Sequence, residues 1–466
     1  MEVLKVAGET QDGRGFLGIF IVLVLVGIVG MGFFSFRRWE GTPPVLKFDR
    51  EISVLGRKPV MKMQVEDYGM GLASIQVVLR QNQQRVVLVE DSFPGSGVWF
   101  WKSGPVQSKE FDLGALIAAK FKVQQGPATL EIETRDHAWR DWLSGNRTSI
   151  SKEFQFKLAP PRIEVLSSQH NIRQGGTECV LYRVTPDAEV SGVQAGPNFF
   201  PGFPVSAGNP GVKFALFAFA YNLPDNAPLK ILARDSAGNE SVASFQYKLF
   251  PHKFRSREME LEDAFLSKVV PEIMSHTPGV PDRGELIKTF VEINNNLRKQ
   301  NHLQVADFCR QSPPQFLWKE AFVQLSNSKV ESVFADHRQY LYQGQRVDEQ
   351  DHVGFDLSVT QHYPVEAAND GIVVYAAYFG IYGNAVILDH GCGLLSLYGH
   401  LSSLAVKPGQ RVHKKEIIGR SGATGLAGGD HLHFGLFLQG VPVNPVEWWD
   451  AHWINDHVLN RLKMPD

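Results

Sequence analysis

Apolar residues alternate with polar ones in short runs through much of this chain, and Gly, Asp and Asn separate the runs. In residues 45–158 the clearest runs are Ile75–Leu79 and Ala128–Thr134. Alternation of this kind predicts short β-strands with one buried face, and strands at such spacing are typical of a β-sandwich. We therefore expect a β-sandwich domain at residues 45–158, after a proline-containing linker at 41–44.

The same pattern returns in residues 159–250, where strands are expected near Thr177–Val184, Val212–Tyr221 and Leu229–Ala233. PATLEIETRD ends at Asp136 and NAPLKILARD ends at Asp235, so two similar strands lie 99 residues apart. The second is followed by SAGNES, which resembles the strand-turn of bacterial immunoglobulin-like domains. We interpret residues 159–250 as a second β-sandwich that repeats the first.

Helical periodicity replaces the alternation in residues 251–330. It predicts one amphipathic helix that Pro271 breaks and another after the turn at Pro278 and Pro281. The apolar positions are Met259, Leu261, Phe265, Leu266, Val269 and Val270 in the first helix, and Leu286, Phe290, Ile293 and Leu297 in the second. Two interpretations stay open: a packing module or spacer, or a segment that covers or positions the groove of the domain that follows.

A run of 21 uncharged residues, 16–36, lies near the N-terminus. Its length predicts a single transmembrane helix after a cytoplasmic tail at 1–15. A signal peptide cleaved near Gly30–Gly32 is the competing interpretation. Lys5 and Arg14 precede the run and four basic residues follow it by position 50, so the charge bias alone would keep the C-terminal side in the cytoplasm. The outside orientation that we expect rests on function.

Composition excludes some classes of protein. The 47 basic and 49 acidic residues leave a net charge of −2, which argues against nucleic acid as a partner. The three cysteines are odd in number and far apart, so no disulfide framework is expected, and none has zinc-ligand spacing. With 466 residues the chain is long enough for several domains.

Seven of the fifteen histidines lie between His352 and His433. Residues two apart on a strand share a face, so His352 and Asp356 in HVGFD are expected to point one way, and His431 and His433 in HLHFG likewise. The intervening apolar positions would face the core: Leu432, Phe434, Leu436 and Leu438. Imidazole and carboxylate are zinc ligands, and the helical HExxH motif is absent, so the pattern predicts a zinc site on strands.

Residues 331–450 resemble the LytM-like, lysostaphin-type zinc metallopeptidases that cleave peptide cross-links in bacterial peptidoglycan. The resemblance rests on VFADHR, HVGFDL, PVEAANDGIVVYA, YGNAVILDHGCG, LYGHLS, IGRSGATG and HLHFGLFLQGVPVNP, in this order. It implies a small antiparallel β fold, one zinc ion held by His352, Asp356 and His433, and a catalytic pair formed by His400 and His431. Asp430, Gly435 and Ala335 depart from the common family pattern, which puts substrate preference in doubt more than catalysis.

Other residues near these motifs have structural interpretations beside functional ones. Tyr398 and Asn384 are candidates for the substrate groove, but such residues at strand ends are more often structural. GATGLAGG, at 422–429, lacks the pattern of a phosphate-binding loop and fits a loop that walls the groove. His390 and His413 fall outside the family's ligand set and are expected at the surface.

The sequence thus predicts a multidomain, mainly β protein: a transmembrane helix, two β-sandwich domains, a short helical segment, a C-terminal antiparallel β zinc-peptidase domain and a tail at 451–466. The expected function is hydrolysis of peptidoglycan cross-links outside the cytoplasmic membrane. A non-catalytic envelope scaffold and a zinc peptidase of protein substrates remain as alternatives. Envelope protein partners, and any group of this chain that masks the free metal position, are not identified by the sequence.

Overall fold

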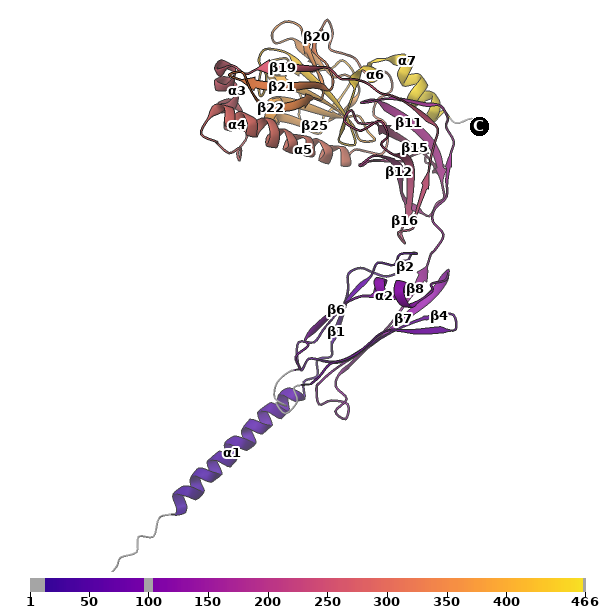
Figure 1. Cartoon of the computed structure of the whole chain (residues 1–466), viewed down its shortest axis with the longest axis vertical. Helices are drawn as coiled ribbons and strands as arrows, with labels where there is room; N and C mark the ends of the chain where they lie inside the picture. Colours follow the sequence, from indigo (N-terminus) through magenta and orange to yellow (C-terminus); the bar gives the residue numbers. More distant parts are fainter. Residues whose placement is uncertain (1–12, 96–103, 464–466) are drawn as a thin grey trace, which may run out of the picture. The chain divides into compact units, whose positions relative to one another are not determined.

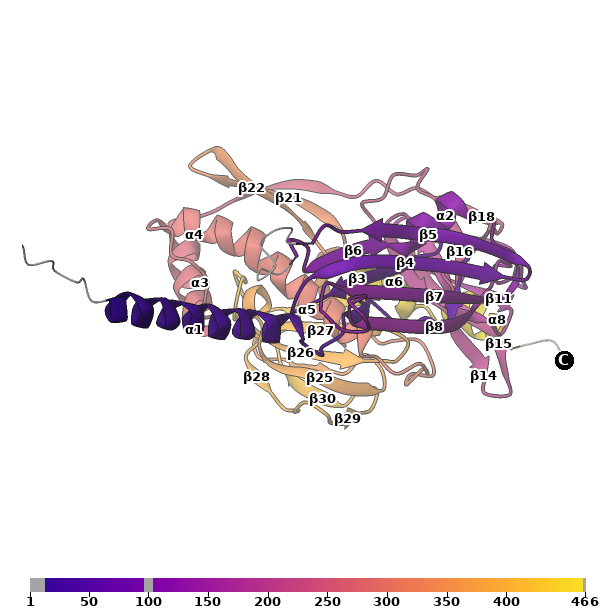
Figure 2. The same ribbon diagram turned by 90° about the horizontal axis from the view of Figure 1, so that it is seen from below.

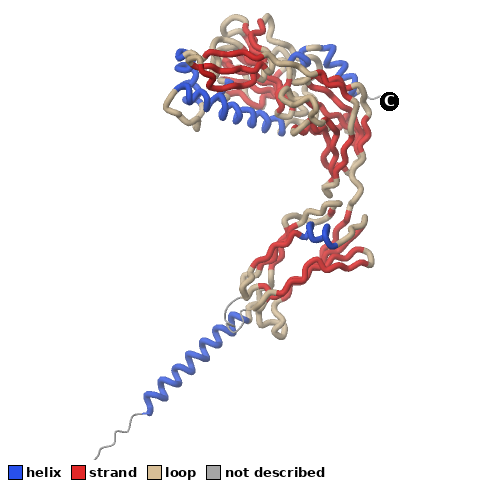
Figure 3. Tube along the Cα trace, viewed as in Figure 1, coloured by secondary structure: helices blue, strands red, loops and turns tan. Residues whose placement is uncertain are grey.

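The computed structural model describes residues 13–95 and 104–463. Most of the expected tail at 1–15, and the last three residues of the tail at 451–466, lie outside the described residues. The chain divides into two compact units, Met1–Pro160 with Ser236–Asn239 and Pro161–Asp235 with Glu240–Asp466. Strands predominate in both units (Figure 3), so the prediction of a mainly β protein is confirmed.

Helix α1 (Gly13–Arg38) is the first element of the first unit (Figure 1). The large apolar side chains between residues 19 and 33 whose burial is described are exposed, from Val24 at 43% to Val29 at 70%. Judged on the residues that the structure describes, no helix combines the length and the apolar character that a membrane crossing needs.

In the described part of the first unit, two sheets and a short helix, α2 (Leu113–Lys120), follow α1. A three-stranded sheet has the order β1 (Val45–Phe48), β3 (Lys62–Glu66), β6 (Ser108–Asp112). A five-stranded sheet has the order β2 (Val54–Leu55), β8 (Arg147–Phe156), β7 (Gly126–Asp136), β4 (Leu72–Gln81), β5 (Gln84–Ser92). Side chains of both sheets, such as Met63 and Leu130, are fully buried in one core. The alternating runs lie within β4 and β7, so the strands predicted there are confirmed.

The second unit begins with another β region. One sheet has the order β14 (Phe203–Ser206), β15 (Asn209–Ala218), β11 (Thr177–Val184), β9 (Ile163–Val165), and another β13 (Asn198–Pro201), β12 (Ala188–Ala195), β16 (Leu229–Asp235), β17 (Glu240–Ala243). Strands β10 (His170–Arg173) and β18 (Tyr247–Phe250) pair in parallel. The three strands expected from the sequence correspond to β11, β15 and β16. The core of this region is continuous with that of the C-terminal domain. Phe214 also packs against Phe316 from the segment that precedes that domain, with ring centroids 5.1 Å apart.

The helical segment differs in part from its prediction. Met259 lies on a strand, β19 (Ser256–Glu260), which pairs in parallel with β21 (Asp336–Tyr342). Helix α3 (Asp263–His276) continues through Pro271, so the predicted break there is wrong. Four side chains of α3 are almost fully buried, and their packing offsets the lost backbone hydrogen bond: Leu266, Val269, Val270 and Ile273. The second helix is confirmed and longer than expected, since α4 (Leu286–Glu292) runs through a π-helical turn, η1 (Ile293–Leu297), into α5 (Arg298–Arg310).

The C-terminal domain is built on an eight-stranded sheet whose central strands are β27 (Leu394–Leu401) and β31 (Leu432–Leu438). Its order is β20 (Lys329–Ser332), β23 (Phe355–Ser358), β31, β27, β26 (Asn384–Asp389), β25 (Gly371–Tyr378), β29 (Arg411–Val412), with β32 (Val441–Val443) beside β31. Two smaller sheets flank it: β19, β21 and β22 (Gln345–His352), and β24 (Pro364–Glu366), β30 (Ile417–Arg420) and β28 (Ser403–Leu404) (Figure 2).

The turn η2 (Gly380–Tyr382) precedes β26, and short helical turns close the chain: α6 (Pro445–Trp449), α7 (Ala451–Ile454), η3 (Asn455–Leu459) and α8 (Asn460–Leu462). His457 Nδ1 lies 2.8 Å from the buried Glu178 carboxylate on β11. The described part of the tail at 451–466 therefore packs against the β region of the same unit.

Candidate metal centre and active site

Three donor atoms meet where the end of β22 approaches the paired strands β23 and β31. His352 Nε2 lies 2.9 Å from Asp356 Oδ1 and 3.0 Å from His433 Nδ1, and His433 Nδ1 lies 3.1 Å from Asp356 Oδ1. Four-coordinate zinc with bonds of about 2.0–2.1 Å has ligand atoms about 3.3 Å apart. The three side chains predicted as metal ligands therefore come together, with a spacing that suits a small divalent cation.

The strands that carry His352 and Asp356 differ from the prediction. His352 ends β22 and Asp356 lies on β23, in different sheets, so the two residues do not share a face of one strand. Val353 and Gly354 connect the two strands. A Cβ on Gly354 would lie 2.6 Å from the carbonyl oxygen of Phe434. A residue without a side chain allows this close passage over β31.

The alternation in HLHFG is confirmed. His433 lies on β31, and His431 forms an isolated bridge just before the strand. Their apolar neighbours are core residues, each at most 2% exposed: Leu432, Phe434, Leu436 and Leu438.

Hydrogen bonds to backbone carbonyls fix the orientation of three imidazole rings. Nδ1 of His352 donates to the carbonyl oxygen of Val333 over 3.0 Å, which leaves Nε2 as the atom facing Asp356 and His433. His400 Nδ1 lies 2.8 Å from the carbonyl oxygen of Thr424, and His431 Nδ1 lies 2.9 Å from that of Gly429. A carbonyl accepts only from a protonated nitrogen, so a neutral ring at each of these positions carries an unprotonated Nε2. Such second partners are what orient histidine ligands in metal sites. At His431 burial lowers the pKa of the ring, but the hydrogen bond with Asp356, the charge of that carboxylate and the bond with Gly429 together raise it by more.

Protonation in the cluster follows from burial and mutual contact. Burial alone would raise the pKa of the Asp356 carboxyl, but His352, His431 and His433 hold it well below its ordinary value. Burial lowers the pKa of His352, and it lowers that of His433 to about 4. Both histidines are thus neutral and Asp356 is ionised at neutral pH. These are the protonation states in which imidazole and carboxylate bind a metal.

His400 and His431 flank the three ligands. Their ring centroids lie 4.8 Å apart, and His431 Nε2 lies 3.5 Å from Asp356 Oδ1. Burial, together with His431 and His433, puts the pKa of His400 well below its ordinary value. The structure therefore brings together all five residues that the sequence and the family resemblance singled out.

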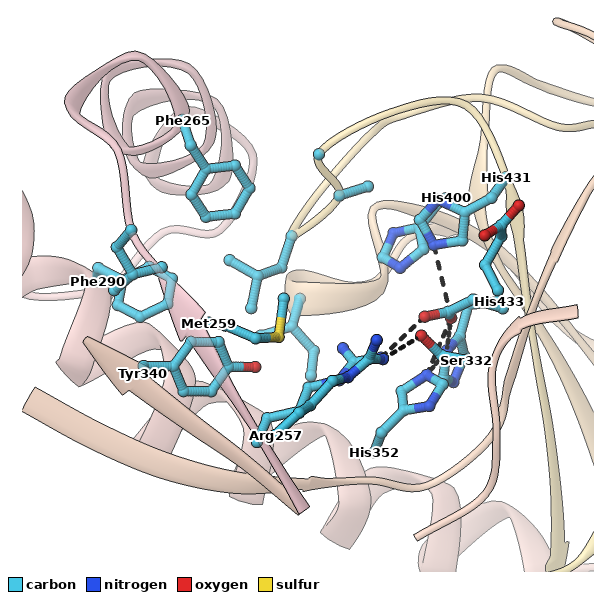
Figure 4. Close-up of a pocket in the computed structure, with 18 of the residues that line it drawn as sticks. Arg257, Met259, Phe265, Phe290, Ser332, Tyr340, His352, His400, His431 and His433 are labelled. Atoms are coloured by element: carbon cyan, nitrogen blue, oxygen red, sulfur yellow. Dashed lines mark hydrogen bonds and ion pairs between the residues drawn. The ribbon is translucent and has the colours of Figure 1, made fainter. Parts of the chain in front are cut away.

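A cavity of about 430 Å³ opens beside these histidines. Figure 4 shows the histidines at one end and apolar side chains, Met259, Phe265, Phe290 and Tyr340, at the other. Leu426, Ala427 and Gly428 also line it, so the 422–429 loop does wall the groove as predicted. Because Phe265 lies on α3 and Phe290 on α4, the helical segment forms part of the wall, which supports the interpretation that it shapes the groove.

The remaining candidates have structural positions. The hydroxyl of Tyr398, which is 1% exposed, accepts from the backbone amide of Ala368, and Asn384 bonds the carbonyl of Leu401. Neither lines the cavity. His413 is at the surface as expected. His390 is not: it is fully buried between the carbonyl of Asp370 and the hydroxyl of Ser396, and a polar partner for each ring nitrogen is what makes its burial possible.

Two parts of the site were not assigned from the sequence. Arg338 donates to Asp356, but the sequence predicted no role for it beyond its place in the VFADHR motif. The Thr424 carbonyl that holds His400 belongs to the backbone, so no residue type signals it. Ala335, which stands where the family often has glycine, has a φ of +57°, so this left-handed position explains that preference.

Fold and site together define a β-strand metal centre of the metallopeptidase type. Residues 350–445 match the model of peptidase family M23, and this segment of the chain is an M23 peptidase domain of the LytM type. The DD-carboxypeptidase/endopeptidase Mpg of Neisseria meningitidis serogroup B is 42% identical over 95 residues, 20% of this chain and 22% of that protein. The peptidoglycan DD-endopeptidase ShyA of Vibrio cholerae serotype O1 is 40% identical over 96 residues, 21% of this chain and 22% of that protein.

Two solved structures are also similar. A putative peptidase M23 from Pseudomonas aeruginosa is 20% identical, covers 60% of this chain and 94% of its own, and has a TM-score of 0.38. The catalytic domain of lysostaphin from Staphylococcus simulans is 29% identical, covers 26% and 92%, and has a TM-score of 0.23. The chain spans only 22% of the length of the two curated relatives above, so the similarity to them concerns the peptidase domain.

Proposed function

We propose that this chain is a zinc metalloendopeptidase that hydrolyses peptide cross-links of bacterial peptidoglycan. The observation that carries the proposal is the triangle of His352, Asp356 and His433 donor atoms, 2.9–3.1 Å apart, with His400 and His431 beside it at the end of a cavity. The names of two relatives, a peptidoglycan DD-endopeptidase and a DD-carboxypeptidase/endopeptidase, support the substrate class.

The donor set fits one zinc ion with three protein ligands, which leaves a fourth position for water. A zinc ion bound there supplies a water with a pKa near 7 and an electrophile for the scissile carbonyl. Of the chain's own groups, the Nε2 atoms of His400 and His431 are positioned to take a proton from the nucleophile and to donate to the developing oxyanion. The cavity aligns the peptide on either side of the scissile bond.

Purified full-length protein tests this proposal. Wild-type protein should contain one zinc and release cross-link peptides from sacculi, which mass spectrometry of the fragments would identify. His352→Ala, Asp356→Ala and His433→Ala should lose both zinc and activity, whereas His400→Ala and His431→Ala should keep zinc and lose activity. Zinc-loaded protein that cleaves a panel of proteins but no sacculi would favour a protein substrate. Zinc-free protein that binds sacculi without cleaving them would favour a scaffold.

We also propose that α1 anchors the protein in the cytoplasmic membrane, with the peptidase domain on the outer side of that membrane. The support is the 21-residue uncharged run within α1 and the exposure of its described apolar side chains. Full-length protein should stay in the membrane fraction after carbonate washing, and a chain beginning at residue 45 should not. Protease added to intact spheroplasts should digest the peptidase domain. Release of the full-length chain by carbonate, or protection of the domain, would contradict the proposal.

A further inference from the structure

Three carboxylates gather in the first unit, apart from the site described above. Glu40 follows the end of α1, Asp67 follows β3, and Asp136 ends β7. One oxygen of each lies within 4.8 Å of the others. Asp67 and Asp136 are 2% and 1% exposed, so two of the three acidic groups are removed from water. The proposed peptidase chemistry uses none of them.

Among the described residues, one oxygen of these three side chains has no donor. Asp67 Oδ2 accepts from the backbone amides of Gly69 and Gly71, but Asp67 Oδ1 is buried without a hydrogen-bond partner among the described residues. In contrast, both oxygens of Asp136 accept from Asn146, and Glu40 Oε1 accepts from the amide of Met70 over 2.8 Å. A buried anionic oxygen with no partner is costly, and a bound cation would remove that cost.

The electrostatics point the same way. Burial raises the pKa of the Asp67 carboxyl, and the nearby Asp136 carboxylate also raises it, against the lowering effect of the Gly71 and Gly69 amides and of His137. A divalent cation between the side chains would stabilise the ionised forms of both. Three acidic groups then become a binding site instead of a source of repulsion.

We infer that Glu40, Asp67 and Asp136 bind a hard divalent cation of the calcium class. All three ligands are carboxylate oxygens, which favour calcium over zinc. Calcium–oxygen bonds of about 2.3–2.6 Å place ligand oxygens up to about 4.6–5.2 Å apart across the ion, which accommodates the 4.8 Å limit of this cluster. Carboxylates that bind through both oxygens, and water, would complete the coordination.

An ion at this position would connect the end of α1 to the β-sheet region of the first unit. The residues after α1 are already fastened to the β-sheet region of the unit: the amide of Trp139 donates to the carbonyl of Arg38 over 2.6 Å, and the Asn146 side chain donates to the carbonyl of Glu40 over 3.1 Å. A cation shared by Glu40, Asp67 and Asp136 would cross-link the end of α1 to β3 and β7. The attachment of α1 to its domain would then depend on calcium.

Calorimetric titration of metal-free, detergent-solubilised full-length protein with calcium chloride tests the inference. Wild-type protein should bind one calcium ion with a dissociation constant on the order of 10⁻⁴–10⁻³ M or tighter. Asp67→Asn and Glu40→Gln should each weaken binding by at least about tenfold, since each removes one charged ligand. Calcium should also raise the unfolding temperature of wild-type protein and not that of Asp67→Asn.

Two control variants locate the ion. Glu153→Gln removes an exposed carboxylate from β8 of the same unit, and His433→Ala removes a ligand of the peptidase site, so both should bind calcium like wild type. No saturable binding to wild-type protein at millimolar calcium would overturn the inference, because the carboxylates would then be neutralised within the protein. If Asp67→Asn fails to fold, the calcium affinity of Glu40→Gln serves as the test, because Glu40 is partly exposed. An affinity equal to that of wild type would also overturn the inference.

Discussion

Arg338 and Asp356 form an ion pair that uses only one of the two carboxylate oxygens. Arg338 Nη2 donates to Asp356 Oδ2 over 2.9 Å, while Asp356 Oδ1 faces the two histidine ligands. The arginine thus fixes the rotation of the carboxylate and leaves one oxygen for the metal. Groups that orient metal ligands in this way contribute to metal affinity without touching the ion.

Replacing Arg338 with alanine should therefore weaken zinc binding by about 10- to 100-fold, because the carboxylate loses its fixed orientation. Competition with a chromogenic chelator measures the affinity. Arg346→Ala, which removes an exposed arginine from the neighbouring strand β22, is the matched control and should bind zinc like wild type. Equal zinc affinity in Arg338→Ala and Arg346→Ala would show that Arg338 does not contribute to zinc binding.

Gly383 should be required for the position of His400. Its φ is +61°, and a Cβ there would lie 2.4 Å from the carbonyl oxygen of Thr424, the group that accepts from His400. We expect Gly383→Ala to shift that carbonyl and lower kcat on peptidoglycan fragments by about 10- to 100-fold, with zinc content unchanged.

Gly409→Ala separates the clash from the cost of the backbone conformation. Gly409 also has a positive φ, +84°, but no atom lies within 4 Å of its added Cβ. Both variants should lose some stability, and only Gly383→Ala should lose activity. A kcat that falls equally in both would show that backbone strain, and not contact with Thr424, is responsible.

Phe265 should contribute to substrate binding from outside the peptidase domain. It lies on α3 and lines the cavity that contains the histidines, with its ring centroid 6.2 Å from that of Phe290. Removing the ring in Phe265→Ala should raise KM for cross-linked peptides about 3- to 10-fold, the worth of one aromatic contact, and leave zinc content unchanged. Steady-state kinetics on purified cross-linked fragments give the answer. Leu303→Ala, an exposed apolar residue of α5 that does not line the cavity, should leave KM unchanged.

Glu447 should make the second unit less stable as the pH rises. Burial raises the pKa of this carboxyl from 4.5 to about 7, against the opposing effect of its bonds with Thr177. Between these two values the folded protein keeps a proton that the unfolded chain has lost, so the stabilisation is present below pH 4.5 and is lost as the pH rises through 7.

The loss is at most about 3 kcal/mol by this linkage. Denaturant titrations at several pH values, followed by tryptophan fluorescence, should show a smaller decrease in the free energy of unfolding for Glu447→Gln than for wild type. Glu320→Gln, at an exposed position, should behave like wild type. Parallel pH curves for Glu447→Gln and wild-type protein would contradict the prediction.

Local periodicity was a sound guide wherever one face of an element is buried by its near neighbours. The runs at 75–79 and 128–134 became parts of β4 and β7, and the alternation after His431 placed Leu432 to Leu438 in the core. It was misleading where distant packing overrides a local rule. Helix α3 continues through Pro271 because its buried face compensates for the proline, and His390 is buried because Asp370 and Ser396 satisfy its ring.

By itself the sequence determined which residue types are available for a metal centre, His352, Asp356 and His433 with His400 and His431, because their spacing and order are written in the chain. Only the tertiary structure decided how they meet: His352 and Asp356 approach from different sheets across Gly354, and Arg338 holds the carboxylate between them. His352 and His433 are 81 residues apart in sequence, yet their nitrogens lie 3.0 Å from each other. The pleat of a strand fixes which neighbours share a face, whereas the contact between two sheets depends on the packing of the whole domain.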